Sequence, residues 1–322
     1  MTLQQAEATC LMVRKQVFDA TMNGREPNVT EVPEEDRLVK RPDGITLRLD
    51  VRYDSVYPNN FCDIWYAGYE DGVKRPTIFS FHGGGFLFGD KQSGDPLAVK
   101  AEGGYNEKIV KAGYNIVECN YCFAPEYRFP AQICQVNEAI AFFQNHPEYG
   151  LDMSRVIVTG GSAGACFTEI YGLAVSDASY AEKLGIKPAV TMKELCCVIV
   201  NEACLQTAVN ASSDNMYALQ ANWFGEESLT EGKKAQLAEV SSHINGLYPP
   251  AYLVASNNEP FFSADVRAMD EALTRYGLAH EIYDEPKERE VLQHGFVGNF
   301  TTSPCAKECF DGILAFLEKY TK

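Results

Sequence analysis

The sequence has no run of about 18 uncharged apolar residues, the length that a membrane-spanning helix needs. Its first twenty residues, MTLQQAEATCLMVRKQVFDA, also lack the basic start and the apolar centre of a secretory signal peptide. It contains neither an internal repeat nor a low-complexity linker. These absences predict a cytoplasmic protein that does not associate with a membrane.

Positive charge is scarce as well. The chain carries 28 Lys and Arg against 44 Asp and Glu, which gives a formal net charge of −16. This surplus of negative charge opposes binding to a phosphate backbone or to an anionic membrane surface. No nucleic acid is therefore expected as a partner, and a neutral small molecule suits the charge better.

The eleven cysteines are an odd number for a disulfide framework, and most lie in apolar runs such as LCCVIV at 195–200. We expect them to be reduced core residues. Cys119-x-x-Cys122 and Cys305-x3-Cys309 have the spacing of metal ligands, but neither has a second pair or a histidine at zinc-site spacing. No metal site is therefore expected.

Apolar residues are plentiful: they make up 46% of the chain, and 18 Phe and 17 Tyr suffice for a large core. From Pro76 onward, short β-branched or aromatic runs alternate with helical segments. Such alternation predicts an α/β protein with a mostly parallel central sheet and helices on both faces. Strands are expected at 45–53 and 61–67 as an antiparallel edge, and then at 76–81, 114–120, 155–160, 196–203, 249–256 and 280–283. Helices are expected at 105–112, 131–145, 163–175, 264–276 and 306–320.

We expect residues 1–322 to form a single domain. An amphipathic N-terminal helix is followed by a polar connector, and together they look like an appended arm. Residues 205–245 fit no strand pattern and include several large aromatic side chains, which favours a helical insertion over the sheet. Ordinary crossover helices with core aromatics remain the alternative interpretation of that interval.

The segment Gly160-Gly161-Ser162-Ala163-Gly164 directly follows the strand run RVIVT and opens a helix. A G-x-S-x-G string in that context is typical of a nucleophile elbow, where small neighbours let the chain turn sharply and expose the serine hydroxyl. A phosphate-binding turn competes with this interpretation, but no G-K-[ST] or G-x-G-x-x-G accompanies it. Ser162 is the predicted nucleophile, and a glycine-rich turn without chemistry is the plain alternative.

His82-Gly83-Gly84-Gly85 comes immediately after the strand run PTIFSF. Acyl transfer builds negative charge on a carbonyl oxygen, and glycines let backbone N–H groups approach that oxygen without obstruction. We predict oxyanion-hole donors at Gly84, Gly85 and Ala163, with His82 organising the loop. A tight loop without this function is the alternative.

A serine nucleophile needs a base, and the chain offers only five histidines. His82 precedes the glycines, whereas His146, His243 and His280 lie in polar or turn-like contexts that suit surface roles. His294 follows the last predicted strand and a long polar loop, where an imidazole can lie over the C-terminal edge of the sheet. His294 is the predicted base, with a structural histidine as the alternative.

Four motifs occur in order along the chain: HGGGFLFGD at 82–90, FAPEYRFPAQ at 123–132, GGSAG at 160–164 and HGF at 294–296. In this combination the chain resembles the hormone-sensitive-lipase-like esterases of the α/β-hydrolase superfamily. It also resembles their relatives among the bacterial carbohydrate esterases, which act as acetyl or acetylxylan esterases. The resemblance extends from about Ile45 to the end of the chain.

The resemblance implies the α/β-hydrolase fold with a small helical cap, formed here by about 1–40 and 205–245. It implies serine hydrolysis of short-chain carboxylic esters without a cofactor. Gly161 stands where lipase-like members often have Asp, which favours the carbohydrate-esterase branch. Gln135 also replaces a frequent Asp, and we expect that change to affect packing more than chemistry.

The acid that orients the base should follow the strand predicted at 249–256, because in α/β-hydrolases the order along the chain is Ser, then Asp or Glu, then His. The only carboxylate directly after that strand is Glu259, although relatives commonly carry Asp there. Asp265, Asp284 and Glu202 remain alternatives for this role.

The expected enzyme is a carboxylesterase in which Ser162, activated by His294 and oriented through Glu259, attacks a short-acyl ester such as an acetylated carbohydrate. Three aromatic residues are candidates for substrate contact: Phe86, Trp223 and Phe224. A peptidase on the same fold and a non-catalytic receptor or binding module are the alternatives. The expected partner is a small-molecule ester, and a homodimer is the candidate assembly.

Overall fold

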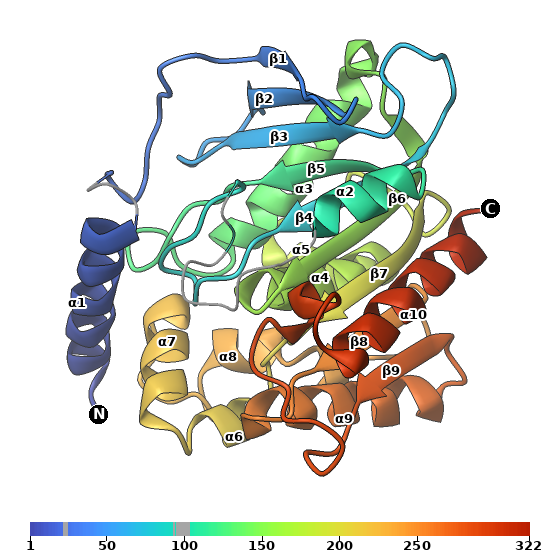
Figure 1. Ribbon diagram of the computed structural model, residues 1–322. Coiled ribbons are helices and arrows are strands. Elements are labelled where there is room, and N and C mark those ends of the chain that lie inside the picture. Colours follow the sequence, from blue (N-terminus) through green and yellow to red (C-terminus); the bar gives the residue numbers. More distant parts are fainter. Residues whose placement is uncertain (22–24, 93, 95–103) are drawn as a thin grey trace.

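The computed structural model describes residues 1–21, 25–92, 94 and 104–322, which form one nine-stranded sheet with helices around it (Figure 1). Across the sheet the strands are β1 (Arg37–Lys40), β2 (Thr46–Arg52), β3 (Phe61–Tyr66), β5 (Asn115–Cys119), β4 (Pro76–Phe81), β6 (Asp152–Gly161), β7 (Leu195–Asn201), β8 (Ala251–Ala255) and β9 (His280–Asp284). The pairs from β1 through β3 to β5 are antiparallel, and every later pair is parallel. The predicted mostly parallel sheet is confirmed.

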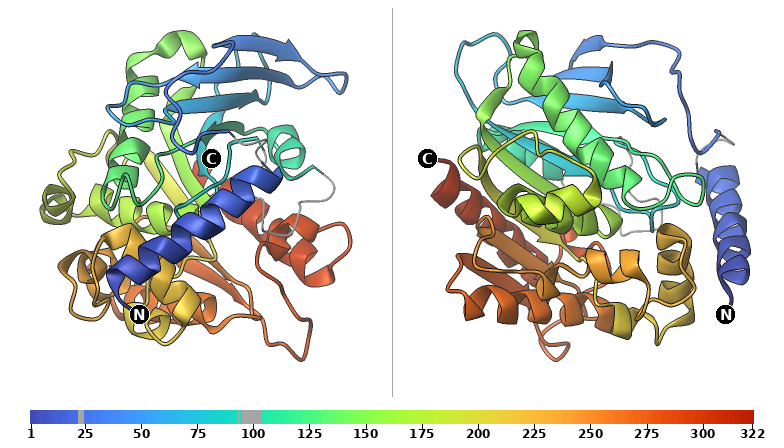
Figure 2. Two further views of the ribbon diagram at one scale, coloured as in Figure 1. Left: turned by 90° about the vertical axis from the view of Figure 1, so that its left-hand side faces the viewer. Right: turned by 180° about the vertical axis from the view of Figure 1, so that it is seen from behind.

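Helices cover both faces of this sheet. The α-helices are α1 (Leu3–Thr21), α2 (Tyr105–Lys111), α3 (Ala131–Asn145), α4 (Ala163–Ser176), α5 (Ala178–Leu184), α6 (Thr207–Asn210), α7 (Asp214–Phe224), α8 (Lys233–Ala238), α9 (Pro260–Arg275) and α10 (Pro304–Thr321). Short 3-10 turns are η1 (Pro147–Tyr149), η2 (Val240–Ser242) and η3 (Phe296–Asn299). Helices α2 and α10 pack on one face, and α3, α4 and α9 pack on the other (Figures 1 and 2).

Two hydrophobic cores result, one on each face of the sheet. Alternate residues of a strand point to opposite faces, so Phe79 and Phe81 of β4 join the core under α3 and α4, while Ile78 joins the core under α2 and α10. Strand β6 divides in the same way, with Val158 in the first core and Ile157 in the second. Both faces are apolar, which explains why the central strands are near-continuous apolar runs.

The antiparallel edge has three strands, whereas the sequence predicted two. A turn at Asp43 and Gly44 joins β1 to β2, and the Ile45 N–H donates to Oδ1 of Asp43 over 3.2 Å. Gly44 has φ of 87°, a conformation that glycine adopts without strain. Strand β1 was missed because it is only four residues long and alternates between partly buried and exposed positions.

The interval 205–245 holds α6, α7 and α8 and no strand, as predicted. Helix α1 packs against α7, and Sγ of Cys10 lies 3.4 Å from the carbonyl oxygen of Ala218 (Figures 1 and 2). Of the other predicted cap segment, about 1–40, the last four residues form β1 at the edge of the sheet.

Nine of the eleven cysteines are buried, in agreement with the prediction that they are core residues. Those with metal-ligand spacing are among them: Cys119, Cys122, Cys305 and Cys309. Burial among apolar groups raises the pKa of Cys122 and Cys309, which keeps these thiols protonated.

Two carboxyl groups meet in the core between α4 and α9. Glu169 is fully buried, and burial together with the neighbouring Asp265 carboxyl raises its pKa. Burial raises the pKa of Asp265 as well, but Asp265 also accepts the Leu205 N–H over 2.8 Å, which favours its ionised form. We infer that Glu169 holds a proton at neutral pH and shares it with Asp265.

A Glu169→Gln variant should therefore lose less stability at alkaline pH than the wild type. Because folding raises the pKa of Glu169, its contribution is complete below the unfolded-state pKa and is lost as pH rises through the folded-state pKa. The free energy of unfolding can be measured by urea titration at pH 6 and at pH 9. Between these two pH values it should fall more in the wild type than in the variant, by up to about 1.4 kcal/mol for each pH unit. Equal slopes in the two proteins would contradict the proton assignment.

Candidate active site

Ser162 lies between β6 and α4 in a strained backbone conformation, with φ of 54° and ψ of −114°. Non-glycine residues rarely adopt this region, and such strain is found where a nucleophile is held at a sharp strand-to-helix turn. The Ser162 N–H donates to the carbonyl of Asn201 over 2.9 Å, which ties the turn to β7. A Cβ atom on Gly164 would overlap the carbonyl of Phe81, so this position requires glycine.

The glycine loop that follows β4 coils tightly. Gly84, Gly85 and Phe86 all have positive φ, and the Gly84 carbonyl accepts the N–H groups of Leu87 and Phe88. Within the described residues, the amides of Gly84 and Gly85 themselves donate no hydrogen bond.

The third predicted donor, Ala163, is the first residue of α4, where helical geometry leaves the N–H without a partner inside the helix. All three predicted donors can therefore bind an added acceptor.

His82 organises this loop, as the sequence predicted. Its ring stacks on Tyr121 with centroids 4.3 Å apart, and its Nδ1 lies 2.7 Å from the Gly83 carbonyl oxygen. The Tyr121 hydroxyl also lies within hydrogen-bond distance of the carbonyls of His82 and Gly83, at 2.8 and 3.0 Å. Burial lowers the pKa of His82 to about 4, so the ring is neutral and its Nδ1–H donates to Gly83.

The carboxylate beside the predicted base belongs to Glu202. Nδ1 of His294 lies 2.9 Å from Oε2 of Glu202, and the same oxygen accepts the Gly295 N–H over 2.8 Å. Phe262 of α9 stacks on the imidazole with ring centroids 4.7 Å apart and an interplanar angle of 8°. These contacts fix the ring so that its other nitrogen, Nε2, points away from the carboxylate.

The prediction of Glu259 as the orienting acid is therefore wrong in geometry, and Glu202, one of the alternatives, occupies that place. Asp284 contacts Ser263 and Arg267 instead, at 2.7 and 2.9 Å. Asp265 lies next to Glu169 in the core between α4 and α9. The carboxylate in contact with His294 thus follows β7 rather than β8.

Just after β8, Asn257 hydrogen-bonds to the loop that precedes His294. Its Oδ1 accepts the Leu292 N–H over 2.8 Å, and its side-chain amide donates to the carbonyls of Glu285 and Glu290, each over 2.9 Å. A neutral amide thus anchors the loop that leads to His294. The loop is therefore attached next to the end of β8, and His294 lies beside Glu202 at the end of the neighbouring strand β7.

Glu202 is buried and has a strained backbone conformation. Its φ is 65°, it is 2% exposed, and its N–H donates to the Val254 carbonyl over 2.8 Å. Backbone strain of this kind in a non-glycine residue occurs at functional sites more often than elsewhere. In the sequence, the signal was a lone carboxylate within the otherwise uncharged run 195–205.

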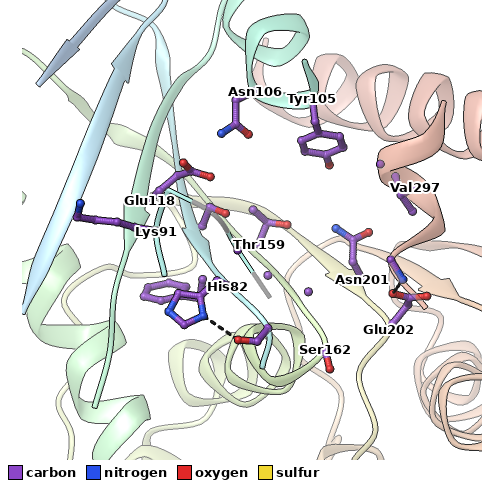
Figure 3. Close-up of a pocket in the computed structure, with 18 of the residues that line it drawn as sticks. His82, Lys91, Tyr105, Asn106, Glu118, Thr159, Ser162, Asn201, Glu202 and Val297 are labelled. Atoms are coloured by element: carbon purple, nitrogen blue, oxygen red, sulfur yellow. Dashed lines mark hydrogen bonds between the residues drawn. The ribbon is translucent and has the colours of Figure 1, made fainter. Parts of the chain in front are cut away.

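A cavity of about 260 Å³ opens at the C-terminal ends of β4, β5, β6 and β7 (Figure 3). It contains Ser162, His294 and Glu202 together. Its remaining walls come from the strand ends, from α2 and from residues 82, 83, 91, 94, 295, 297 and 298. Parallel α/β sheets bind ligands at this edge, so the cavity is the candidate active site.

The predicted aromatic substrate contacts do not line this cavity. Phe86 is 2% exposed, and Trp223 and Phe224 are fully buried. Phe86 and Trp223 stack face to face with centroids 3.9 Å apart, and the indole N–H donates to Gln132 over 3.0 Å. These side chains form the packed interior between the glycine loop and α7, so their assignment to substrate contact is corrected.

Gln135 is fully buried and does not contact the candidate site residues. Its Oε1 accepts the Cys122 N–H over 2.6 Å, and its amide donates to the Pro58 carbonyl over 2.9 Å. The expected packing role is confirmed.

A family model described as BD-FAE matches residues 62–266, which is more than half of the chain. The chain belongs to the BD-FAE family. Among curated proteins, this BD-FAE chain is 26% identical to esterase LipI of Mycobacterium tuberculosis over 258 residues, covering 78% of this chain and 75% of LipI. It is 27% identical to carboxylesterase NlhH of the same organism over 297 residues, covering 88% and 86%.

Solved structures show the same architecture. Esterase B from Lactobacillus rhamnosis (HN001) aligns with this BD-FAE chain at a TM-score of 0.73 and 18% identity, over 98% of this chain and 96% of the esterase. The predicted α/β-hydrolase fold is confirmed, and so is the enzyme class, a serine-hydrolase carboxylesterase. In the described part of the chain, no helix is both long enough and apolar enough to cross a membrane.

The position of Glu202 predicts a large effect for Glu202→Gln, because the amide cannot stabilise an imidazolium and favours the wrong tautomer of His294. Turnover of p-nitrophenyl acetate should fall by a factor on the order of 10³–10⁴. Glu259→Gln is the matched control and should stay within about threefold of the wild type. The opposite ranking of the two variants would return the role to Glu259.

Proposed function

We propose that this BD-FAE enzyme hydrolyses short-acyl carboxylic esters, acetylated carbohydrates among them, through a Ser162–His294–Glu202 triad. The observation that carries the proposal is the 2.9 Å contact between Nδ1 of His294 and Oε2 of Glu202, in a cavity that also contains Ser162. A carboxylate, an imidazole and a serine hydroxyl in this relation are the parts of an acyl-transfer site.

The first half of the reaction acylates the enzyme. Nε2 of His294 takes the Ser162 hydroxyl proton while Oγ attacks the ester carbonyl carbon, and Glu202 stabilises the imidazolium that forms. The N–H groups of Gly84, Gly85 and Ala163 bind the oxyanion of the tetrahedral intermediate. Collapse of the intermediate breaks the bond to the alcohol oxygen, which receives the proton from Nε2 and leaves.

The second half uses water in the same way. Nε2 removes a proton from the attacking water, the oxyanion forms again, and collapse breaks the bond to Oγ of Ser162, which recovers its proton from His294. The carboxylic acid product leaves and the resting enzyme is restored.

A small acyl group fits the packing around the glycine loop. The stacked rings of Phe86 and Trp223 fill the interior behind that loop, and Leu219 of α7 lies against Gly85. A long acyl chain finds little room on that side. The net charge of −16 is also better suited to a neutral ester than to an anionic one.

We also propose that α1 and the helices of 205–245 act as the cap of the site. The support is that α1 packs on α7, and α7 contacts the glycine loop through Leu219. A cap assembled in this way links the N-terminal helix to the predicted oxyanion hole.

The proposed mechanism predicts that Ser162→Ala lowers kcat for p-nitrophenyl acetate by a factor on the order of 10⁴ or more. Activity of the wild type should be highest with acetyl and butyryl esters and should fall with longer chains. The exposed Ser212→Ala serves as the matched control and should behave as wild type. Turnover by the Ser162 variant at the wild-type rate would remove this serine from the mechanism.

A further inference from the structure

The end of the cavity away from Ser162 carries polar side chains that are not part of the proposed triad. On the sheet face under α2 and α10, the strands carry isoleucines at 78, 116 and 157, which belong to the second hydrophobic core. Two residues further along each strand, on the same face, the side chains become polar. They are Ser80 of β4, Glu118 of β5 and Thr159 of β6.

These three residues form a continuous row. Glu118 pairs in register with Ser80, and Ser80 pairs in register with Thr159, so their side chains stand side by side across three neighbouring strands. All three line the cavity that contains Ser162. We call Glu118, Ser80 and Thr159 the polar row.

Glu118 is the ionisable member of the polar row. Within the described residues it forms no ion pair, because the nearby Lys91 ammonium binds Asp50 and Asp63 at 2.8 and 2.9 Å. Asn106 of α2 also lines the cavity, and Figure 3 shows Asn106 and Glu118 at the opposite end of the cavity from Ser162.

Desolvation raises the pKa of Glu118 to about 7, so at neutral pH a fraction of the carboxyl is protonated and can donate as well as accept.

An aliphatic acyl chain has no group that can hydrogen-bond to such a wall, and burying polar groups against it carries a cost. Hydroxyl groups of a polyol or sugar both donate and accept, and they match a carboxyl, an amide and two hydroxyls. The polar row therefore suits the alcohol side of the ester rather than the acyl side. Tyr105, which also lines the cavity, offers an aromatic surface for the face of a sugar ring.

We propose that the polar row and Asn106 form the subsite for a hydroxylated alcohol moiety, and that Glu118 determines the preference for polyol and sugar esters over simple alkyl esters. This inference rests on the proposed esterase function. It adds the residue that distinguishes one alcohol from another.

The test compares esters that share the acetyl group and differ in the alcohol. Glycerol monoacetate and acetylated xylo-oligosaccharides carry free hydroxyls, and ethyl acetate carries none. Glu118→Leu should lower the ratio of kcat/KM for the hydroxylated esters to that for ethyl acetate by about tenfold, mainly through KM. Glu118→Gln, which keeps the shape and part of the hydrogen bonding, should lower the ratio less.

Two further variants separate binding from folding. Ser80→Ala changes the neighbouring position of the polar row without touching the carboxyl, and it should shift the ratio in the same direction. Glu138→Gln removes another partly buried carboxyl with a raised pKa, on α3 outside the cavity, and should leave the ratio as in the wild type.

The outcomes distinguish the two proposals. A wild type that hydrolyses ethyl acetate, together with Glu118 and Ser80 variants that leave the ratio unchanged, would overturn the subsite and keep the esterase function. An equal shift in Glu138→Gln would also overturn it. A folded wild type that hydrolyses none of these esters would overturn both.

Discussion

The contact between His294 and Glu202 is the constraint around which the site is built. A carboxylate that is 2% exposed is costly unless donors satisfy it, and Oε2 of Glu202 has both the imidazole Nδ1 and the Gly295 N–H beside it. Its backbone is held in a left-handed conformation by the bond from its own N–H to Val254 of β8. The ring is held by stacking on Phe262. Each of these contacts restricts rotation, so the imidazole of His294 has a fixed orientation without a substrate present.

The rest of the fold brings distant segments to that contact. Parallel strands end at the same edge of a sheet, so the loops after β4, β6 and β7 meet although they are far apart in sequence. The loop that carries His294 enters from the far side, and Asn257 at the end of β8 fastens it. Close backbone approach at Gly164 lets the start of α4 lie against the end of β4. The elbow and the glycine loop are therefore fixed relative to each other.

Local patterns were sufficient to predict most of this arrangement. Alternating strands and helices gave the parallel sheet, and the strings around Ser162 and His82 were informative because their chemistry depends on residues adjacent in sequence. Strand β1 was missed because four half-exposed residues carry too little pattern. Phe86 and Trp223 were misassigned, since a sequence does not show whether an aromatic ring faces a cavity or another ring.

The carboxylate that contacts His294 was predicted wrongly for a different reason. Chain order allows an acid after either of two neighbouring strands, and Glu259 fitted the more common choice. What decides between them is the three-dimensional path of the loop before His294, which depends on the hydrogen bonds of Asn257 to residues about 30 positions away. No spacing in the sequence encodes those contacts. The signal that the sequence offered for Glu202 was a single carboxylate in the otherwise uncharged run 195–205.

The most direct test is a crystal structure of the protein with a small alkyl phosphonate bound covalently to Ser162. We expect the phosphonyl oxygen to accept hydrogen bonds from the amides of Gly84, Gly85 and Ala163, with Nε2 of His294 near Oγ and Nδ1 on Glu202. A structure in which Nδ1 binds Glu259, or in which His294 does not approach the modified serine, would contradict the account.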